Sequence, residues 1–141
     1  LIDYAHTPDS MVNVLQTVKE FAKGRTVAVF GCGGDRDKTK RPRMGKAAAD
    51  WSDFAVVTTD NPRTEEPAAI IRDILPGFDG RKTPYEVVED RVEAIHWAMD
   101  HAQKDDVIVL CGKGHETTQE IDGKLLPLDE RQIIAEYING S

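Results

Sequence analysis

The feature that most constrains the fold is the alternation of short apolar runs with longer segments of helical periodicity. The runs at 26–30, 54–58 and 107–111 are almost entirely apolar, which is typical of strands buried on both faces of a parallel sheet. In segments such as 8–23, apolar residues recur every three to four positions, as on one face of a helix. The sequence therefore predicts an α/β, Rossmann-like three-layer domain with a mostly parallel sheet.

Turn and capping residues set the expected bounds of the other elements. We expect helices at about 8–23, 44–51, 67–75, 90–103 and 129–140, and strands at 26–30, 54–58, 85–88 and 107–111. The pair Asp122-Gly123 is a favoured two-residue turn, so we expect one edge hairpin and about six strands in all. No repeat or linker interrupts the chain, and residues 1–141 are therefore expected to form a single domain.

Composition limits the classes of partner. The chain has 141 residues and a formal net charge of −7, which makes nucleic acid a poor candidate because phosphate contacts need a basic patch. No apolar stretch reaches the ~20 residues of a membrane span. Cys32 and Cys111 lack zinc spacing, and we expect plain thiols in a cytoplasmic protein rather than metal ligands or a nucleophile. The start at Leu1, inside a strand-like segment, suggests a piece of a longer protein.

Three polar loops follow predicted strands, and ligands of open parallel sheets bind beyond the carboxyl ends of the strands. The first loop, 31–41, combines glycines that permit close backbone approach with cations that suit a carboxylate or phosphate. Its cations are Arg36, Lys38, Lys40 and Arg41. Its spacing fits neither a P-loop nor the dinucleotide fingerprint. The alternative is a flexible, solvated charged loop.

The second loop is Asp60-Asn61-Pro62-Arg63. Pro62 stiffens the backbone, Arg63 offers a planar fork to a carboxylate, and Asp60 accepts from an ammonium. This combination can bind a zwitterion. The alternative is an ordinary turn in which Arg63 pairs with Glu65 or Glu66.

The third loop runs from Gly112 to Glu116. Glu116 can accept from an ammonium, and Gly112 can offer its carbonyl where a side chain would obstruct. We interpret His115 as a hydrogen-bonded structural residue rather than a ligand. Near the start of the chain, Asp3 either binds a ribose hydroxyl or caps a turn.

Four segments together resemble the C-terminal domain of the Mur ligases, in particular the members that add meso-diaminopimelate. They are 3–8, 30–38, 60–67 and 112–116, and the resemblance covers essentially the whole chain in order. It implies that seven residues contact meso-diaminopimelate: Arg36, Asp60, Asn61, Pro62, Arg63, Gly112 and Glu116. It also implies that Asp3 and His6 face the nucleotide, with no catalytic residue or metal ligand in this chain.

The same resemblance implies a three-domain enzyme that uses ATP and Mg²⁺ to join meso-diaminopimelate to UDP-MurNAc-L-Ala-D-Glu. The dipeptide and the P-loop would belong to domains outside this chain. We therefore expect the chain alone to be an inactive monomer that binds neither cofactor and holds the amino acid weakly. The alternatives are a related ligase for lysine or a folylpolyglutamate-type substrate, and a non-catalytic α/β ligand-binding domain.

Overall fold

The structure is a computed structural model that describes residues 1–114, 116, 118–121 and 124–140. The expected turn at Asp122-Gly123 and the residue His115 lie outside these described residues.

Five parallel strands form the central sheet in the order β1-β5-β2-β3-β4. Their bounds are β1 Ile2–Asp3, β2 Thr26–Phe30, β3 Phe54–Val57, β4 Tyr85–Val87 and β5 Val107–Cys111. All five positions of β2 are buried, which explains why this strand shows no polar alternation. The predicted fold class is confirmed.

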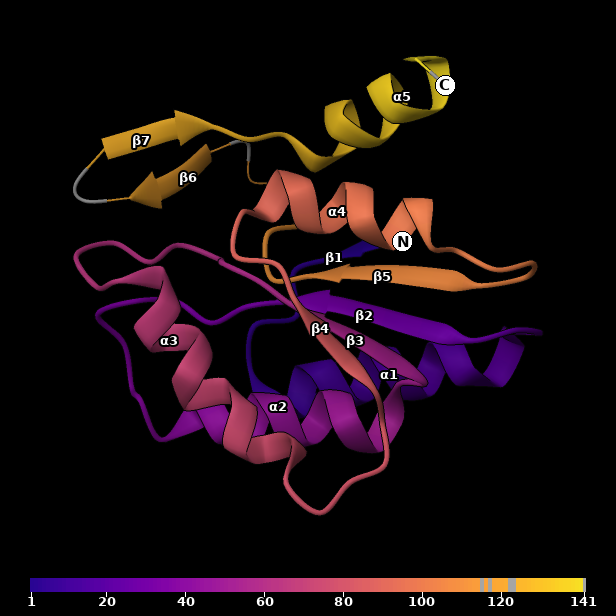
Figure 1. Cartoon of the computed structure of the whole chain (residues 1–141), viewed down its shortest axis with the longest axis horizontal. Helices are drawn as coiled ribbons and strands as arrows, with labels where there is room; N and C mark the ends of the chain where they lie inside the picture. The colour runs from indigo at the N-terminus through magenta and orange to yellow at the C-terminus, as the bar shows by residue number, and fades with distance from the viewer. Residues whose placement is uncertain (115, 117, 122–123, 141) are drawn as a thin grey trace.

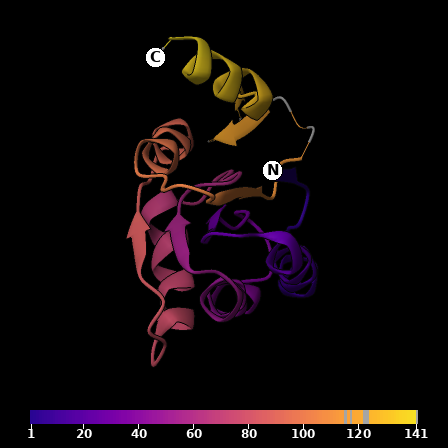
Figure 2. The same cartoon turned by 90° about the vertical axis from the view of Figure 1, so that its right-hand side faces the viewer.

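Helices cover both faces of the sheet (Figures 1 and 2). They are α1 Pro8–Phe21, α2 Lys40–Trp51, α3 Pro67–Ile74, the 3₁₀ turn η1 Leu75–Phe78, α4 Arg91–Asp100 and α5 Glu130–Gly140. Figure 1 shows α1, α2 and α3 on one face and α4 on the other, with α5 beyond α4. This follows from right-handed crossovers, because the chain steps one way from β1 to β4 and returns to β5.

Two hydrophobic clusters lie on opposite faces of the sheet. Phe30 belongs to the cluster under α1, α2 and α3, with Leu15 and Ile74. Its neighbour Val29 belongs to the cluster under α4, with Ile95. Successive strand residues point to opposite faces, so each central strand serves both cores. None of the helices in the described residues is long and apolar enough to cross a membrane.

Local hydrogen bonds refine the expected helix bounds. Asp90 caps α4 through the backbone N–H of Glu93, as the sequence predicts. The helix predicted over Met44–Trp51, with Pro42 at its start, begins earlier, because α2 starts at Lys40. Asp37 accepts from the backbone and hydroxyl of Thr39 just before this start. The first helical turn therefore includes Arg41, which the sequence had assigned to an open loop.

The hairpin consists of β6 Thr118–Ile121 and β7 Lys124–Pro127. These strands form a separate two-stranded sheet, so the expected edge hairpin of a six-strand sheet is wrong in this respect. The hairpin pairs instead with the loop after β3: Arg63 N donates to Glu120 O at 3.0 Å, and Gln119 Nε2 donates to Asp60 O at 2.7 Å. Arg63 and Ile121 form an isolated parallel bridge, so the hairpin gives this loop a fixed backing.

A buried ion pair ties α5 to the rest of the fold. Arg91 Nε lies 2.8 Å from Glu130 Oε2, and both side chains have zero exposure. Arg91 also donates to the carbonyls of Cys111 at 2.9 Å and Thr59 at 3.3 Å. One guanidinium therefore links α4 and α5 to the carboxyl ends of β3 and β5.

We expect Arg91→Met to lower the free energy of unfolding by about 3–5 kcal/mol, because it leaves a buried carboxylate without its partner. Lys46→Met is the control: Lys46 pairs with Asp50 at 3.1 Å on the exposed surface of α2, and its loss should cost less than about 1 kcal/mol. Urea unfolding of both variants checks this. Equal losses would contradict a structural role specific to Arg91.

Candidate functional site

A cavity of about 420 Å³ opens at the carboxyl edge of the sheet. Its walls come from the segments that follow β1, β2, β3 and β5. Six of the seven residues predicted to contact the amino acid line it: Arg36, Asp60, Asn61, Arg63, Gly112 and Glu116. The topology therefore brings together three loops that are distant in sequence.

Pro62 is the exception, because it is buried behind the cavity wall and does not line it. Its segment touches the first loop through backbone atoms: Gly34 N donates to Asn61 O at 2.7 Å. A Cβ atom on Gly34 would lie 1.8 Å from Pro62 O. Glycine is thus required at this position for the two loops to meet.

Arg63 braces the cavity wall as well as lining it. Its backbone has a φ of 52°, and its Nη1 donates to Gly34 O at 3.0 Å and to Asn61 O at 3.3 Å. Its Nε lies 3.4 Å from Glu120 Oε1. The alternative in which Arg63 pairs with Glu65 or Glu66 is therefore wrong. Among the described residues, Nη2 makes no hydrogen bond and remains for a ligand.

Arg41 is not the free cation that the sequence suggested. Its side chain is 1% exposed and pairs with Glu65 at 2.7 Å and Asp73 at 2.8 Å. It also donates to Gly33 O at 3.2 Å. This network ties the first loop to Glu65 just before α3 and to Asp73 near the end of α3. The charge of Arg41 is therefore balanced within the fold.

Lys113 lies beside the cavity and was not singled out from the sequence. Its side chain has zero exposure, and its Nζ lies 3.0 Å from Asn61 Oδ1 and 3.6 Å from Asp60 Oδ1. Burial lowers the pKa of this ammonium, and the Asp60 carboxylate opposes that shift. The flanking Gly112 and Gly114 have φ values of 114° and 55°, which let the loop turn the lysine inward. The sequence signal that could have indicated this inward-facing lysine is its position between two glycines.

The cavity carries both signs of charge. Its lining cations are Arg36, Lys40, Arg63 and the already paired Arg41, and its lining carboxylates are Asp37, Asp60 and Glu116. Arg36 and Lys40 are exposed, and the carboxylate of Glu116 lies 4.0 Å from Lys113 Nζ. Such a lining suits a ligand with several ammonium and carboxylate groups.

Part of the segment after β1 lines the cavity. Tyr4 and His6 line the cavity, with ring centroids 4.8 Å apart. Asp3 does not line it, and its side chain accepts from the backbone N–H of Ala5 at 2.8 Å. Asp3 therefore caps a turn, which was one of its two interpretations. That Asp3 and His6 face a nucleotide stays a prediction.

Cys32 lines the cavity as a neutral thiol. Burial, together with the Asp60 carboxylate, raises the pKa of Cys32 to about 12. Burial likewise raises the pKa of Cys111 to about 12. Both cysteines are free, and a protonated thiol is a weak nucleophile. In the part of the chain that the structure describes, no three His, Cys, Asp or Glu residues are grouped as metal ligands.

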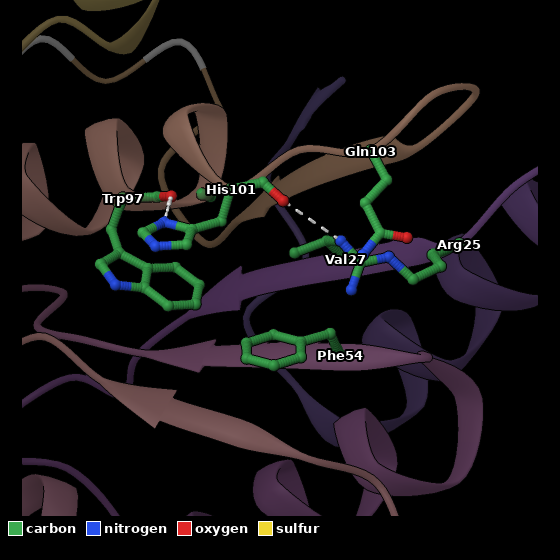
Figure 3. Close-up of a pocket in the computed structure, with 7 residues that line it drawn as sticks. Arg25, Val27, Phe54, Trp97, His101 and Gln103 are labelled. Carbon is green, nitrogen blue, oxygen red and sulfur yellow. Dashed lines mark hydrogen bonds between the residues drawn. The ribbon is translucent and has the colours of Figure 1, made fainter.

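A second, smaller pocket of about 190 Å³ lies at the opposite end of the strands (Figure 3). Trp97 stacks between Phe54 and His101, at centroid distances of 5.5 and 4.0 Å. Arg25, which lines this pocket, is already paired with Asp106 at 2.7 Å. Because this charge is neutralised, the cavity at the carboxyl edge is the stronger candidate.

Comparisons with known proteins bear on the family of the chain. Residues 1–114 match the family described as "Mur ligase, glutamate ligase domain". The chain is 54% identical over 137 residues to the UDP-N-acetylmuramoyl-L-alanyl-D-glutamate--2,6-diaminopimelate ligase of Caldanaerobacter subterraneus subsp. tengcongensis. It is 53% identical over 138 residues to the ligase of the same name from Clostridium botulinum. The alignments cover 97% and 98% of the chain, but the chain spans only 28% of either relative.

Solved structures are similar as well. A UDP-N-acetylmuramoyl-L-alanyl-D-glutamate--2,6-diaminopimelate ligase superimposes with a TM-score of 0.92 at 43% identity, covering 99% of this chain and 28% of that one. A bifunctional folylpolyglutamate synthase/dihydrofolate synthase from Yersinia pestis gives a TM-score of 0.59 at 22% identity, covering 82% of this chain and 26% of that one. The second likeness shows a shared fold alone.

The Arg41–Glu65 contact should make stability depend on pH. The Arg41 guanidinium, helped by the backbone N–H of Asp35, lowers the pKa of Glu65 to about 2. A carboxyl with a lowered folded-state pKa stabilises the fold above its unfolded pKa, and this contribution disappears as pH falls from about 5 to about 2. Glu65→Gln should therefore cost on the order of 1–2 kcal/mol at pH 7, after solvent screening, and progressively less below pH 5.

Urea unfolding across this pH range measures the difference. Glu66→Gln removes a neighbouring exposed carboxylate and serves as the control. A loss of the same size and pH profile in both variants would contradict the assignment to Arg41.

Proposed function

The chain belongs to the Mur ligase family, matching its glutamate ligase domain over residues 1–114, and we propose that it is the amino-acid-binding C-terminal domain of a longer ligase. In this proposal residues 1–141 form one of three domains. The ligase adds meso-diaminopimelate to UDP-MurNAc-L-Ala-D-Glu in cytoplasmic peptidoglycan synthesis.

The observation that supports this proposal most strongly is the mixed charge of a single cavity lined by six of the predicted residues. Meso-diaminopimelate carries two carboxylates and two ammonium groups. Arg36 and Arg63 are assigned to carboxylates, whereas Asp60, Glu116 and the carbonyl of Gly112 are assigned to ammonium groups. Holding the amino acid this way would orient its amine toward the activated carboxyl and lower the entropic cost of the reaction.

The remaining chemistry is assigned to the other domains. When bound in the complete enzyme, ATP supplies a phosphoryl group that activates the dipeptide carboxyl, with Mg²⁺ offsetting the charge of the phosphates. The amine then attacks, and an amide, ADP and phosphate result. We assign no metal ligand to this domain, and only the segment of Asp3 and His6 is proposed to face the nucleotide. The domain is proposed to be monomeric, with no nucleic acid partner.

Discrimination between meso-diaminopimelate and lysine is the finer part of the proposal. Lysine lacks the second carboxylate and would leave the Nη2 group of Arg63 without an acceptor, with Glu120 as its remaining anion. A cost of roughly 3 kcal/mol for a charged donor left unpaired in the complex corresponds to about a hundredfold preference. A lysine ligase or a non-catalytic binding domain would not need this second cation in the cavity.

The test of the proposed function uses the full-length ligase with UDP-MurNAc-L-Ala-D-Glu, ATP, Mg²⁺ and labelled amino acid. We expect incorporation of meso-diaminopimelate at least a hundredfold more efficiently than lysine, measured as kcat/KM. The 141-residue chain alone should hydrolyse no ATP and bind the amino acid weakly by calorimetry. Equal use of lysine, or turnover by the isolated chain, would refute the proposal.

Arg63→Ala in the full-length ligase should raise KM for meso-diaminopimelate at least tenfold and leave KM for ATP within about twofold. The reason is loss of the contact between a ligand carboxylate and the Nη2 group of Arg63, which the ammonium of Arg63→Lys cannot fully restore because it lacks the planar guanidinium that also braces the wall. Arg72→Ala is the matched control, because Arg72 is exposed on α3. Steady-state kinetics with each substrate varied separates the outcomes, and equal increases in both KM values would indicate a purely structural role.

A further inference from the structure

The side-chain amide of Asn61 is held from behind by two donors. Its Oδ1 accepts from Lys113 Nζ at 3.0 Å and from the backbone N–H of Glu120 at 2.8 Å. Neither an ammonium nor a backbone N–H can accept a hydrogen bond. The opposite flip would set the amide NH₂ group against both donors, so the orientation of Asn61 is fixed by chemistry.

The consequence lies on the cavity side. Asn61 lines the cavity, and among the described residues its Nδ2 makes no hydrogen bond. An asparagine alone can present either an oxygen or an NH₂ group to a ligand. With the oxygen occupied, this one presents only donors, and donors match a carboxylate rather than an ammonium.

The side chain of Lys113, which fixes the orientation of the Asn61 amide, is fully buried. Besides Asn61, its Nζ donates to Thr118 O at 2.8 Å, which joins the third loop to β6. Its charge is balanced by Asp60, whose Oδ1 lies 3.6 Å away and is buried without a hydrogen-bond partner among the described residues. A buried ammonium is retained only where such partners compensate it.

We propose that Lys113 is a positioning residue that makes Asn61 an obligatory donor to a ligand carboxylate and thereby contributes to amino-acid selectivity. Lys113 does not touch the ligand and acts only through Asn61. The inference rests on the proposed function, since it concerns the same cavity and the same amino acid.

The decisive variant is Asn61→Asp in the full-length ligase. Aspartate keeps an oxygen toward Lys113 and Glu120, so the fold should persist, but it turns an anionic oxygen toward the cavity. We expect KM for meso-diaminopimelate to rise more than tenfold, and further than in Asn61→Ala, with KM for ATP within twofold. An unchanged KM for the amino acid would overturn the proposal.

A double-mutant cycle tests the part played by Lys113. Lys113→Met should raise KM for meso-diaminopimelate at least tenfold in the wild-type background, but less than threefold once Asn61 is alanine, with kcat within threefold throughout. The exposed Lys82 gives the control variant Lys82→Met, expected to be neutral. Equal effects of Lys113→Met in both backgrounds would refute coupling through Asn61.

The two proposals fail differently. If the wild-type ligase does not incorporate meso-diaminopimelate, the proposed function is wrong. If it does and Asn61→Asp is neutral, only the positioning role of Lys113 is wrong. Should Lys113→Met fail to fold by circular dichroism, Lys113→Gln in the same two backgrounds takes its place, and an equal rise of KM with Asn61 and with alanine at position 61 would again refute the coupling.

Discussion

The insertion of β5 between β1 and β2 is the constraint on which the site depends. It places the segments after β1, β5, β2 and β3 side by side at one edge of the sheet. Main-chain hydrogen bonds then join them: Gly112 N donates to Asp3 O, Thr58 N to Phe30 O, and Gly34 N to Asn61 O. Because the contacts use backbone atoms, the shape of the cavity depends on the fold and on a few glycines rather than on the side chains that would meet a ligand.

The central strands and most helices were predictable because their signals are local. A five-residue apolar run is too short for a typical buried helix and therefore indicates a strand. Asp90 marks the start of α4 because its carboxylate caps the first turn. The convergence of three loops was predictable too, since carboxyl ends of parallel strands share an edge. Strand order was not needed for that inference. The placement of the hairpin was not predictable, because its partner is an irregular loop rather than another strand.

The sequence also could not predict which groups each charged side chain would contact. Arg36, Arg41 and Arg63 look equivalent in composition, yet one is exposed, one is 1% exposed within an ion-pair network, and one is divided between bracing and the cavity. Asp35 and Arg63 also have positive φ values, which a periodic pattern does not reveal. Helical periodicity says nothing about such turns, so the predicted start of α2 was late and Arg41 was assigned to the wrong environment.

Two buried ion pairs lie close to this edge, and their cost bears on how the site works. Lys113 with Asp60, and Arg91 with Glu130, have been removed from water, and burying ions usually costs more than their attraction returns. Apolar replacements would make a more stable wall. An apolar wall could not orient polar groups in this way. Lys113 fixes which end of the Asn61 amide faces the cavity. Arg91 donates to the carbonyls of Thr59 and Cys111, the residues immediately before Asp60 and Gly112. The loops are thus oriented before a ligand arrives, and the ordering cost is met during folding instead of at binding.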